Sequence, residues 1–178
     1  VHDPNHNDQT AVHIESFAAL QVNCPLPNPS STITGIIVQA PLEALDIENN
    51  TVSQSRAGGI IVLRAGGVTD VKSNTVSQSQ GDGIRLTIVR QKAAVEGNTV
   101  TGSSGHGVAI ANADQDLKVK GQTVSGSAGT GISVVRAAGL NVVIERNGVT
   151  GSGREGITLE QAPGLPELTD NTIDGTGT

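Results

Sequence analysis

Residues 49–60 read NNTVSQSRAGGI, and residues 73–84 read SNTVSQSQGDGI. The six letters NTVSQS recur after 24 positions, and the pair Gly-Ile closes both stretches. Recurrence at a fixed interval of this length is typical of a repeat protein, in which each repeat forms one structural unit that stacks on the next.

Two short motifs keep this interval through most of the chain. The first is Asn-Thr-Val or a close variant, which begins at Asn50, Asn74, Asn98, Gln122, Asn147 and Asn171. The second is a glycine followed by Ile or Val, and its glycines are Gly35, Gly59, Gly83, Gly107, Gly131 and Gly156. A single step in each series is longer than the others, by one position. Two motifs in phase over six copies indicate a regular solenoid.

Each repeat contains three short segments in which apolar and polar residues alternate, such as residues 60–62, 69–71 and 75–77. Alternation is typical of strands that bury one face, and the Gly, Ser and Asn residues between the segments predict turns. A left-handed hexapeptide helix would repeat after about 18 residues. We therefore predict an all-β fold, a right-handed parallel β-helix of about seven coils.

Residues 35–178 hold the regular coils, whereas residues 1–34 fit the period less well and form an irregular first coil or cap. Residues 11–14 lie 24 positions before residues 35–38, which predicts a strand in register. The spacing of Ile14, Phe17 and Ala18 would also suit a capping helix over residues 11–20. The Pro-rich residues 24–29 predict a loop. Because both ends of the chain fall within a coil, we expect one domain that is a segment of a longer chain.

The composition narrows the classes of function. The 178 residues include 23 Gly and one Phe but no Trp, Tyr or Met, so Val, Ile, Leu and Ala must fill the interior. The formal charge of −6 argues against nucleic acid or anionic lipid as the main partner. No apolar run is long enough to insert into a membrane as a helix.

Each position of the repeat becomes a row along the helix axis. The first residue of each Asn-Thr-Val motif belongs to a row of stacked amides. Each amide can bond to the amides of adjacent coils and to the backbone of the turn, and Asn tolerates the left-handed conformation of a sharp turn. Two residues earlier, the charge alternates in sign at Glu48, Lys72, Glu96, Lys120 and Glu145. Opposite charges on paired strands contribute about 0.2–1 kcal/mol each. We interpret both rows as structural.

Three groups of residues are candidates for chemistry. The residues that directly precede the glycines of the second motif form another row, in which Asp82 and His106 lie one coil apart. With Arg85 nearby, they make a set suited to acid–base catalysis. The alternative is that this row lies in a solvated turn, where the residue type is free to vary and the Asp–His pair has no function.

The best acid cluster for a ligand is Glu43, Asp46 and Asp70, although Ala94 and Lys118 follow in the same row and favour a solvated face. The terminal His2, Asp3 and His6 suit a metal ion, with a disordered terminus as the alternative. We expect no cofactor.

The coil pattern G-[IV]-x-[VIL]…V-x-x-N-T-V-[ST]-[GQ]-S over residues 35–178 resembles the right-handed parallel β-helix repeat superfamily of pectin-lyase-like proteins. The resemblance implies that the amide row is an asparagine ladder. Since that superfamily includes polysaccharide lyases, hydrolases, epimerases, phage tailspikes and adhesins, the resemblance implies a fold and no single reaction.

We therefore expect a non-enzymatic structural module, a rigid spacer, stalk or adhesin-like segment of a secreted, periplasmic or cell-surface protein. The first alternative is a polysaccharide-binding module, or a polysaccharide-processing one like a lyase, hydrolase or epimerase. The second is a self-assembly module that associates end to end or side by side. Expected partners are polysaccharide or other protein chains. An ice-binding surface is not expected, because no outward row is identified as a regular Thr row.

Overall fold

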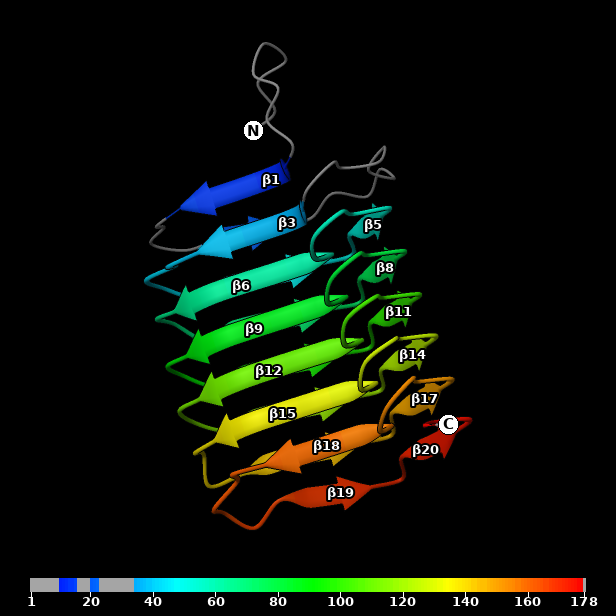
Figure 1. Ribbon diagram of the computed structural model, residues 1–178. Coiled ribbons are helices and arrows are strands. Elements are labelled where there is room, and N and C mark those ends of the chain that lie inside the picture. The colour runs from blue at the N-terminus through cyan, green and yellow to red at the C-terminus, as the bar shows by residue number, and fades with distance from the viewer. Residues whose placement is uncertain (1–9, 16–19, 23–33, 178) are drawn as a thin grey trace.

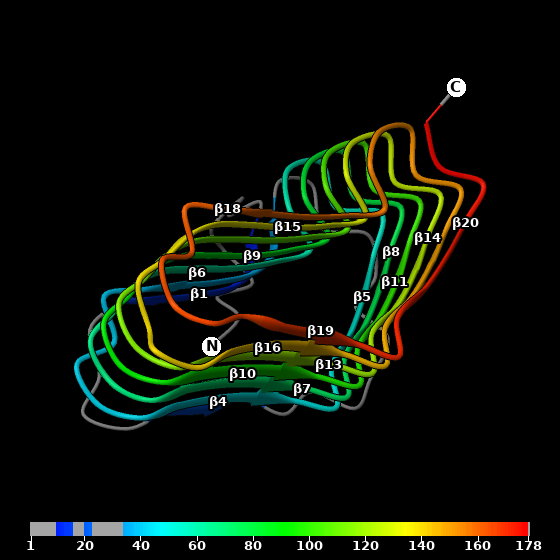
Figure 2. The same ribbon diagram turned by 90° about the horizontal axis from the view of Figure 1, so that it is seen from below.

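The computed structural model of the chain describes residues 10–15, 20–22 and 34–177. In this part of the chain the regular elements are β-strands, and they form three parallel sheets around one core (Figure 1). Seen along the axis, the chain passes from sheet A to sheet B to sheet C and then begins the next coil (Figure 2). The predicted all-β solenoid is confirmed.

Sheet A contains β1 (Thr10–Glu15), β3 (Thr34–Gln39), β6 (Ile60–Ala65), β9 (Ile84–Val89), β12 (Val108–Ala113), β15 (Ile132–Ala137) and β18 (Ile157–Glu160). Sheet B contains β2 (Leu20–Val22), β4 (Leu45–Glu48), β7 (Thr69–Lys72), β10 (Ala93–Glu96), β13 (Leu117–Lys120), β16 (Val142–Glu145) and β19 (Glu167–Thr169). Sheet C contains β5 (Thr51–Ser53), β8 (Thr75–Ser77), β11 (Thr99–Thr101), β14 (Thr123–Ser125), β17 (Gly148–Thr150) and β20 (Thr172–Asp174). Six coils therefore have all three strands, and the first is described only in β1 and β2.

The strand register follows the sequence period. Ala113 pairs with Ala137 at the ordinary period, whereas Leu117 pairs with Val142, one position further along the chain than that period requires. The additional residue of the long coil therefore lies in 138–141, at the corner between sheets A and B. All three sheets keep their alignment because this corner absorbs the insertion.

The N-terminal strand also follows the predicted register. Val12 pairs with Ile36 and Leu20 pairs with Leu45. The strand interpretation of residues 11–14 is therefore confirmed, and a capping helix there is wrong, because the backbone of β1 pairs with β3. Residues 16–19 and the Pro-rich stretch lie outside the described residues.

The core consists of rows of aliphatic side chains stacked from coil to coil. One row, from β4 to β16, is fully buried and comprises Ile47, Val71, Val95, Val119 and Ile144. Such β-branched side chains pack well on a pleated surface, which explains how a core can form without aromatic rings. In the last described coil, Leu168 continues this row and Ile173 continues the Val row of sheet C, but they are 50% and 48% exposed, because β19 and β20 have a paired strand on one side only among the described residues.

Each of the six coils with three described strands turns at three residues with positive φ, one near the end of each strand, and the last coil has a fourth at Gly177. At the corner between sheets B and C these residues are Asn49, Ser73, Gly97, Gly121, Arg146 and Asp170. The left-handed residue is thus the one before each ladder amide. The expectation that the ladder Asn itself adopts this conformation is wrong, because its side chain must point inward.

The glycines of the second motif are required by close packing. A Cβ on Gly107 would lie 2.3 Å from Val124 Cγ1 and 2.6 Å from the Gly131 carbonyl oxygen. The equivalent glycine of every coil meets the sheet C side chain of its own coil in the same way. This contact brings the start of each sheet A strand against sheet C and closes the coil.

We expect Gly107→Ala to lower the free energy of unfolding by about 2–4 kcal/mol, because the new methyl group overlaps the core. Gly121→Ala is the matched control: its φ is +61° but its Cβ would meet nothing closer than 3.9 Å. It should cost about 1 kcal/mol of backbone strain. Urea unfolding measures both, and equal losses would contradict the packing argument.

Ile88 is a β-branched residue held at a φ of +60°. We expect Ile88→Asn to raise the free energy of unfolding by about 0.5–1 kcal/mol, since Asn tolerates this conformation and the lost apolar contact is partial. Ile61→Asn makes the same chemical change at a half-buried position of a regular strand and should lower stability. Thermal unfolding followed by circular dichroism tests the opposite signs.

Candidate functional site

The buried amides at the corner between sheets B and C form a continuous ladder. Asn98 Oδ1 accepts hydrogen bonds from the Asn74 backbone N–H and Nδ2, both at 2.9 Å. The Asn98 amide nitrogen donates to the Val71 carbonyl at 2.9 Å and to Gln122 Oε1 at 3.1 Å. The ladder continues through Asn147 to Asn171. Since the amides bond to one another and to the backbone of adjacent coils, the predicted asparagine ladder is confirmed.

The charged row on the outer face of sheet B has the predicted alternating register. Lys120 Nζ lies 2.7 Å from Glu145 Oε1 within the row, and this hydrogen bond is the main reason that the pKa of Glu145 falls below its usual value. Lys72 instead pairs with Asp70 of its own strand at 2.9 Å, and that bond raises the pKa of Lys72. The row alternates as expected, but part of its pairing crosses to the neighbouring row.

The acid cluster of Glu43, Asp46 and Asp70 is only partly assembled. Asp46 and Asp70 face each other on β4 and β7, and Asp70 is bound to Lys72. Asp46 Oδ1 is buried and has no hydrogen-bond partner among the described residues, whereas Glu43 is exposed at the preceding corner. Sequence spacing correctly placed the two aspartates side by side but did not foresee that Lys72 neutralises one of them.

A hollow of about 370 Å³ lies on the same face over Ala94, where the outward row carries its smallest side chain. Its rim includes Lys118, Lys92 and Asp116. Asp116 accepts hydrogen bonds from the backbone and side-chain nitrogens of Asn141, and its carboxylate lies 3.4 Å from Lys92 Nζ. These contacts lower the pKa of Asp116, and the bond from the Asn141 side chain has the largest effect. Lys118 Nζ lies 3.1 Å from Glu96 Oε1, so Lys118, Lys92 and Asp116 all have partners.

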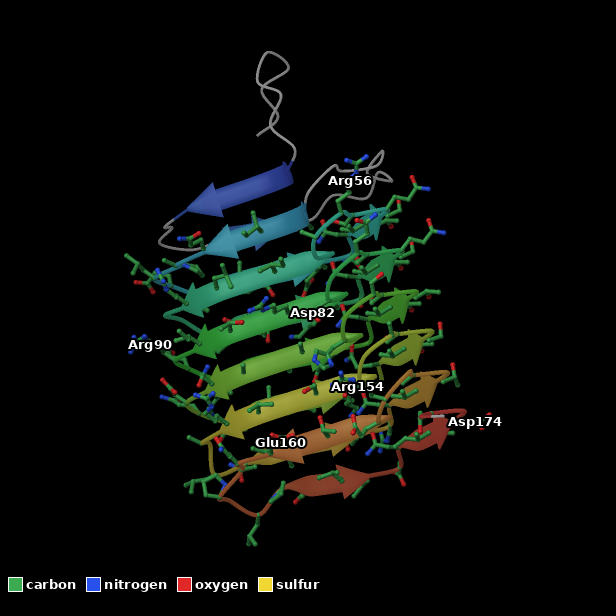
Figure 3. All side chains as sticks on the ribbon, in the orientation of Figure 1. Arg56, Asp82, Arg90, Arg154, Glu160 and Asp174 are labelled. Atoms are coloured by element: carbon green, nitrogen blue, oxygen red, sulfur yellow. The ribbon has the colours of Figure 1, made fainter. Side chains whose placement is uncertain are left out.

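The column of Asp82, His106, Thr130 and Glu155 follows the corner where each coil enters sheet A, and Figure 3 shows Asp82 at this edge. Asp82 Oδ1 accepts the His106 backbone N–H at 2.9 Å, and His106 Nδ1 accepts the Thr130 N–H at 3.1 Å. Thr130 Oγ1 then donates to Glu155 Oε2 at 2.9 Å. The side chains of this column connect successive coils, and the Asp82 carboxylate contacts the His106 backbone.

Arg85, the third member of the proposed catalytic set, lies on the outer face of sheet A. Its Nε donates to Thr87 Oγ1 of the same strand at 3.3 Å. Glu155, at the far end of the column, has a lowered pKa because its carboxylate accepts its own backbone N–H and the Thr130 hydroxyl. The described contacts therefore join Asp82 to His106 but leave Arg85 on a separate face.

The metal candidates His2, Asp3 and His6 lie outside the described residues. Within residues 10–15, 20–22 and 34–177, no three His, Cys, Asp or Glu side chains are grouped to hold a metal ion. The described chain also has no helix of the length and apolarity that a membrane span requires.

One feature of the surface was missed in the sequence. The first outward row of sheet C is Thr51, Thr75, Thr99, Thr123, Gly148 and Thr172. The expectation that no outward row is a regular Thr row is therefore wrong. The Thr of each Asn-Thr-Val motif carried the signal, but the motif was used to set the period and to place the amide ladder, and its Thr residues were not considered as an outward row.

A family model described as a right-handed beta helix region matches residues 30–178. This chain belongs to the right-handed β-helix family. The match covers every strand from β3 onward and agrees with the parallel sheets and the regular spacing of the coils. No curated protein and no solved structure matches the chain.

We expect part of the acid sensitivity of this β-helix to come from Glu145. Because folding lowers the pKa of Glu145, its ion pair stabilises the fold above the usual glutamate pKa of about 4.3, and this contribution is lost as the pH falls further. Glu145→Gln should therefore lose less stability than wild type between neutral and acidic pH. Glu167→Gln, at an exposed position of the same sheet, is the control, and identical pH profiles for all three proteins would contradict the assignment.

Proposed function

We propose that this β-helix is a non-enzymatic structural module, a rigid spacer or stalk segment of a secreted or surface protein. The observation that carries the proposal is that most of the candidate catalytic and ligand-binding side chains are bonded to other parts of the β-helix. Asp82, His106 and Glu155 are bonded to neighbouring coils, and Asp70 is bonded to Lys72. Asp82, His106 and Glu155 thus hold successive coils in register, and Asp70 is occupied by an ion pair within its own strand.

The regularity of the coils supports the same role. From β3 onward, the strand pairing departs from a constant period by a single position, and the departure is confined to residues 138–141. Enzymes usually carry their catalytic groups on loops supported by a rigid scaffold. In residues 34–177, the corners between strands are short, so the scaffold itself makes up most of the described chain.

A polysaccharide-binding module remains the alternative, and the hollow over Ala94 is the observation that favours it. An apolar floor of Ala94 and Val143 beside Lys118, Asp116 and Asn141 suits a sugar ring, which has both C–H faces and hydroxyl groups. A self-assembly role is supported by the edges of β18, β19 and β20, each of which has a neighbouring strand on one side only.

A glycan array and a turnover assay on acidic polysaccharides test the proposal. We expect neither binding nor turnover. Sugar binding that is lost in the double variants Asp46→Asn/Asp70→Asn or Asp82→Asn/His106→Gln, or in Ala94→Leu, would overturn it. Ala109→Leu on sheet A controls for the added side chain, and light scattering over a concentration series reports self-assembly.

A further inference from the structure

The outer face of sheet C carries two parallel rows made mostly of small hydroxyl side chains, with Gly148 in the first row and Asp174 in the second as the exceptions. The first is the Thr row defined above. The second, two residues further along each strand, is Ser53, Ser77, Thr101, Ser125, Thr150 and Asp174. A Val between the two rows is buried in the first five strands and fixes them to the core, at Val52, Val76, Val100, Val124 and Val149. Ile173 has the equivalent position in the last strand but is 48% exposed.

These two rows form a two-dimensional lattice. Neighbouring coils repeat at about 4.8 Å, and side chains two residues apart along a strand lie about 6.6 Å apart. The six strands are stacked in register, and Figure 1 shows them as one regular column. Threonine is stiff about χ1, so its hydroxyl and methyl groups hold fixed positions on such a face.

The surroundings of the lattice leave it open and free of charge over its central strands. Thr75, Thr99 and Thr123 are exposed. The corner residues beside β11 and β14 are glycines with positive φ, Gly97 and Gly121 on one side and Gly102 and Gly126 on the other. These four corner positions therefore place no side chain beside the two strands. Among the described corner residues with positive φ on these two sides, charge first appears at Arg146, whose Nε lies 3.9 Å from Asp170 Oδ2. The last strand carries Asp174, which is labelled in Figure 3.

A flat, uncharged face of this kind cannot enclose a small ligand, since each hydroxyl offers one weak contact. It can bind a ligand that is itself a rigid lattice, because many weak contacts then form together without further ordering cost. Water molecules joined by O–H···O bonds of about 2.75 Å in a tetrahedral lattice repeat at about 4.5 Å and about 7.3 Å. Against the 4.8 Å coil repeat, the mismatch over the six strands is about 1.5 Å, less than half of the lattice repeat.

We propose that the outer face of sheet C is an ice-binding surface. The Thr and Ser hydroxyl groups take positions in the hydrogen-bond network of ice, and the Thr methyl groups exclude mobile water between them. The central strands β8, β11 and β14 make most of the contact, because they combine both hydroxyl rows with glycine corners. This activity needs no catalytic group and is independent of a structural role for the other two sheets.

Thermal hysteresis and inhibition of ice recrystallisation by the purified chain test this proposal. Wild type should separate the melting and freezing points of ice, and Thr99→Lys and Thr123→Lys should lose most of that separation, because a hydrated ammonium group lifts the face away from the lattice. The matched control is Thr87→Lys on the outer face of sheet A, which should keep wild-type activity. Circular dichroism checks that all three variants are folded.

A gain of activity provides a second test that folding defects cannot mimic. Gly148 interrupts the Thr row, and a Cβ there would meet its nearest atom, the Gln122 carbonyl oxygen, at 3.9 Å. Gly148→Thr should therefore complete the row and increase thermal hysteresis. Absence of hysteresis in wild type would overturn the proposal, as would equal loss in the sheet A control. Binding to crystalline cellulose or chitin without any effect on ice would also overturn it and assign the face to a polysaccharide.

Discussion

A buried amide at the corner between sheets B and C must find partners for a carbonyl oxygen and two N–H groups where water cannot reach. In this protein the partners come from the coils on either side: Asn98 binds Asn74, Gln122 and the backbone of β7. The consequence is a strict register. A coil displaced by one position along its strand would leave an unsatisfied buried amide, which costs about 1–3 kcal/mol. Sheets B and C meet at this corner, so both depend on it.

A fixed register gives each sheet a uniform outer surface with its own chemistry. Sheet B carries paired charges such as Lys120 and Glu145, whereas sheet C carries hydroxyl groups. The outer face of sheet A is mostly small or aliphatic, with Ala109 and Ile61 half-buried. Because side chains alternate in and out along a strand, one residue per coil sets the character of a whole row. A single short repeat unit can therefore specify three different surfaces at once.

The period alone was enough to predict the sheets, the register and the amide ladder, because stacking requires residues in the same row to meet. Side-chain direction was not predictable in this way. Spacing placed Asp82 beside His106, but the carboxylate bonds to the backbone N–H at that corner. Arg85 alternates onto the outer face and bonds to Thr87. The Thr row was missed for a different reason: the motif was assigned to the amide ladder through its Asn and to the core through its Val, and its outward Thr was left without a role.

The corner of residues 138–141 accommodates one additional residue, with Leu140 81% exposed, while the strands on both sides keep their pairing. Gly139 allows this by lying against the backbone of the coil above, where a Cβ would meet the Gln115 carbonyl oxygen at 2.1 Å. The length of this corner can thus change without altering the strand pairing of the three sheets. A foreign peptide inserted at this corner, between sheets A and B, would be held by a rigid β-helix at a defined position along the helix axis and in a defined direction. Repeated at successive coils, the same graft would place binding groups at intervals of about 4.8 Å.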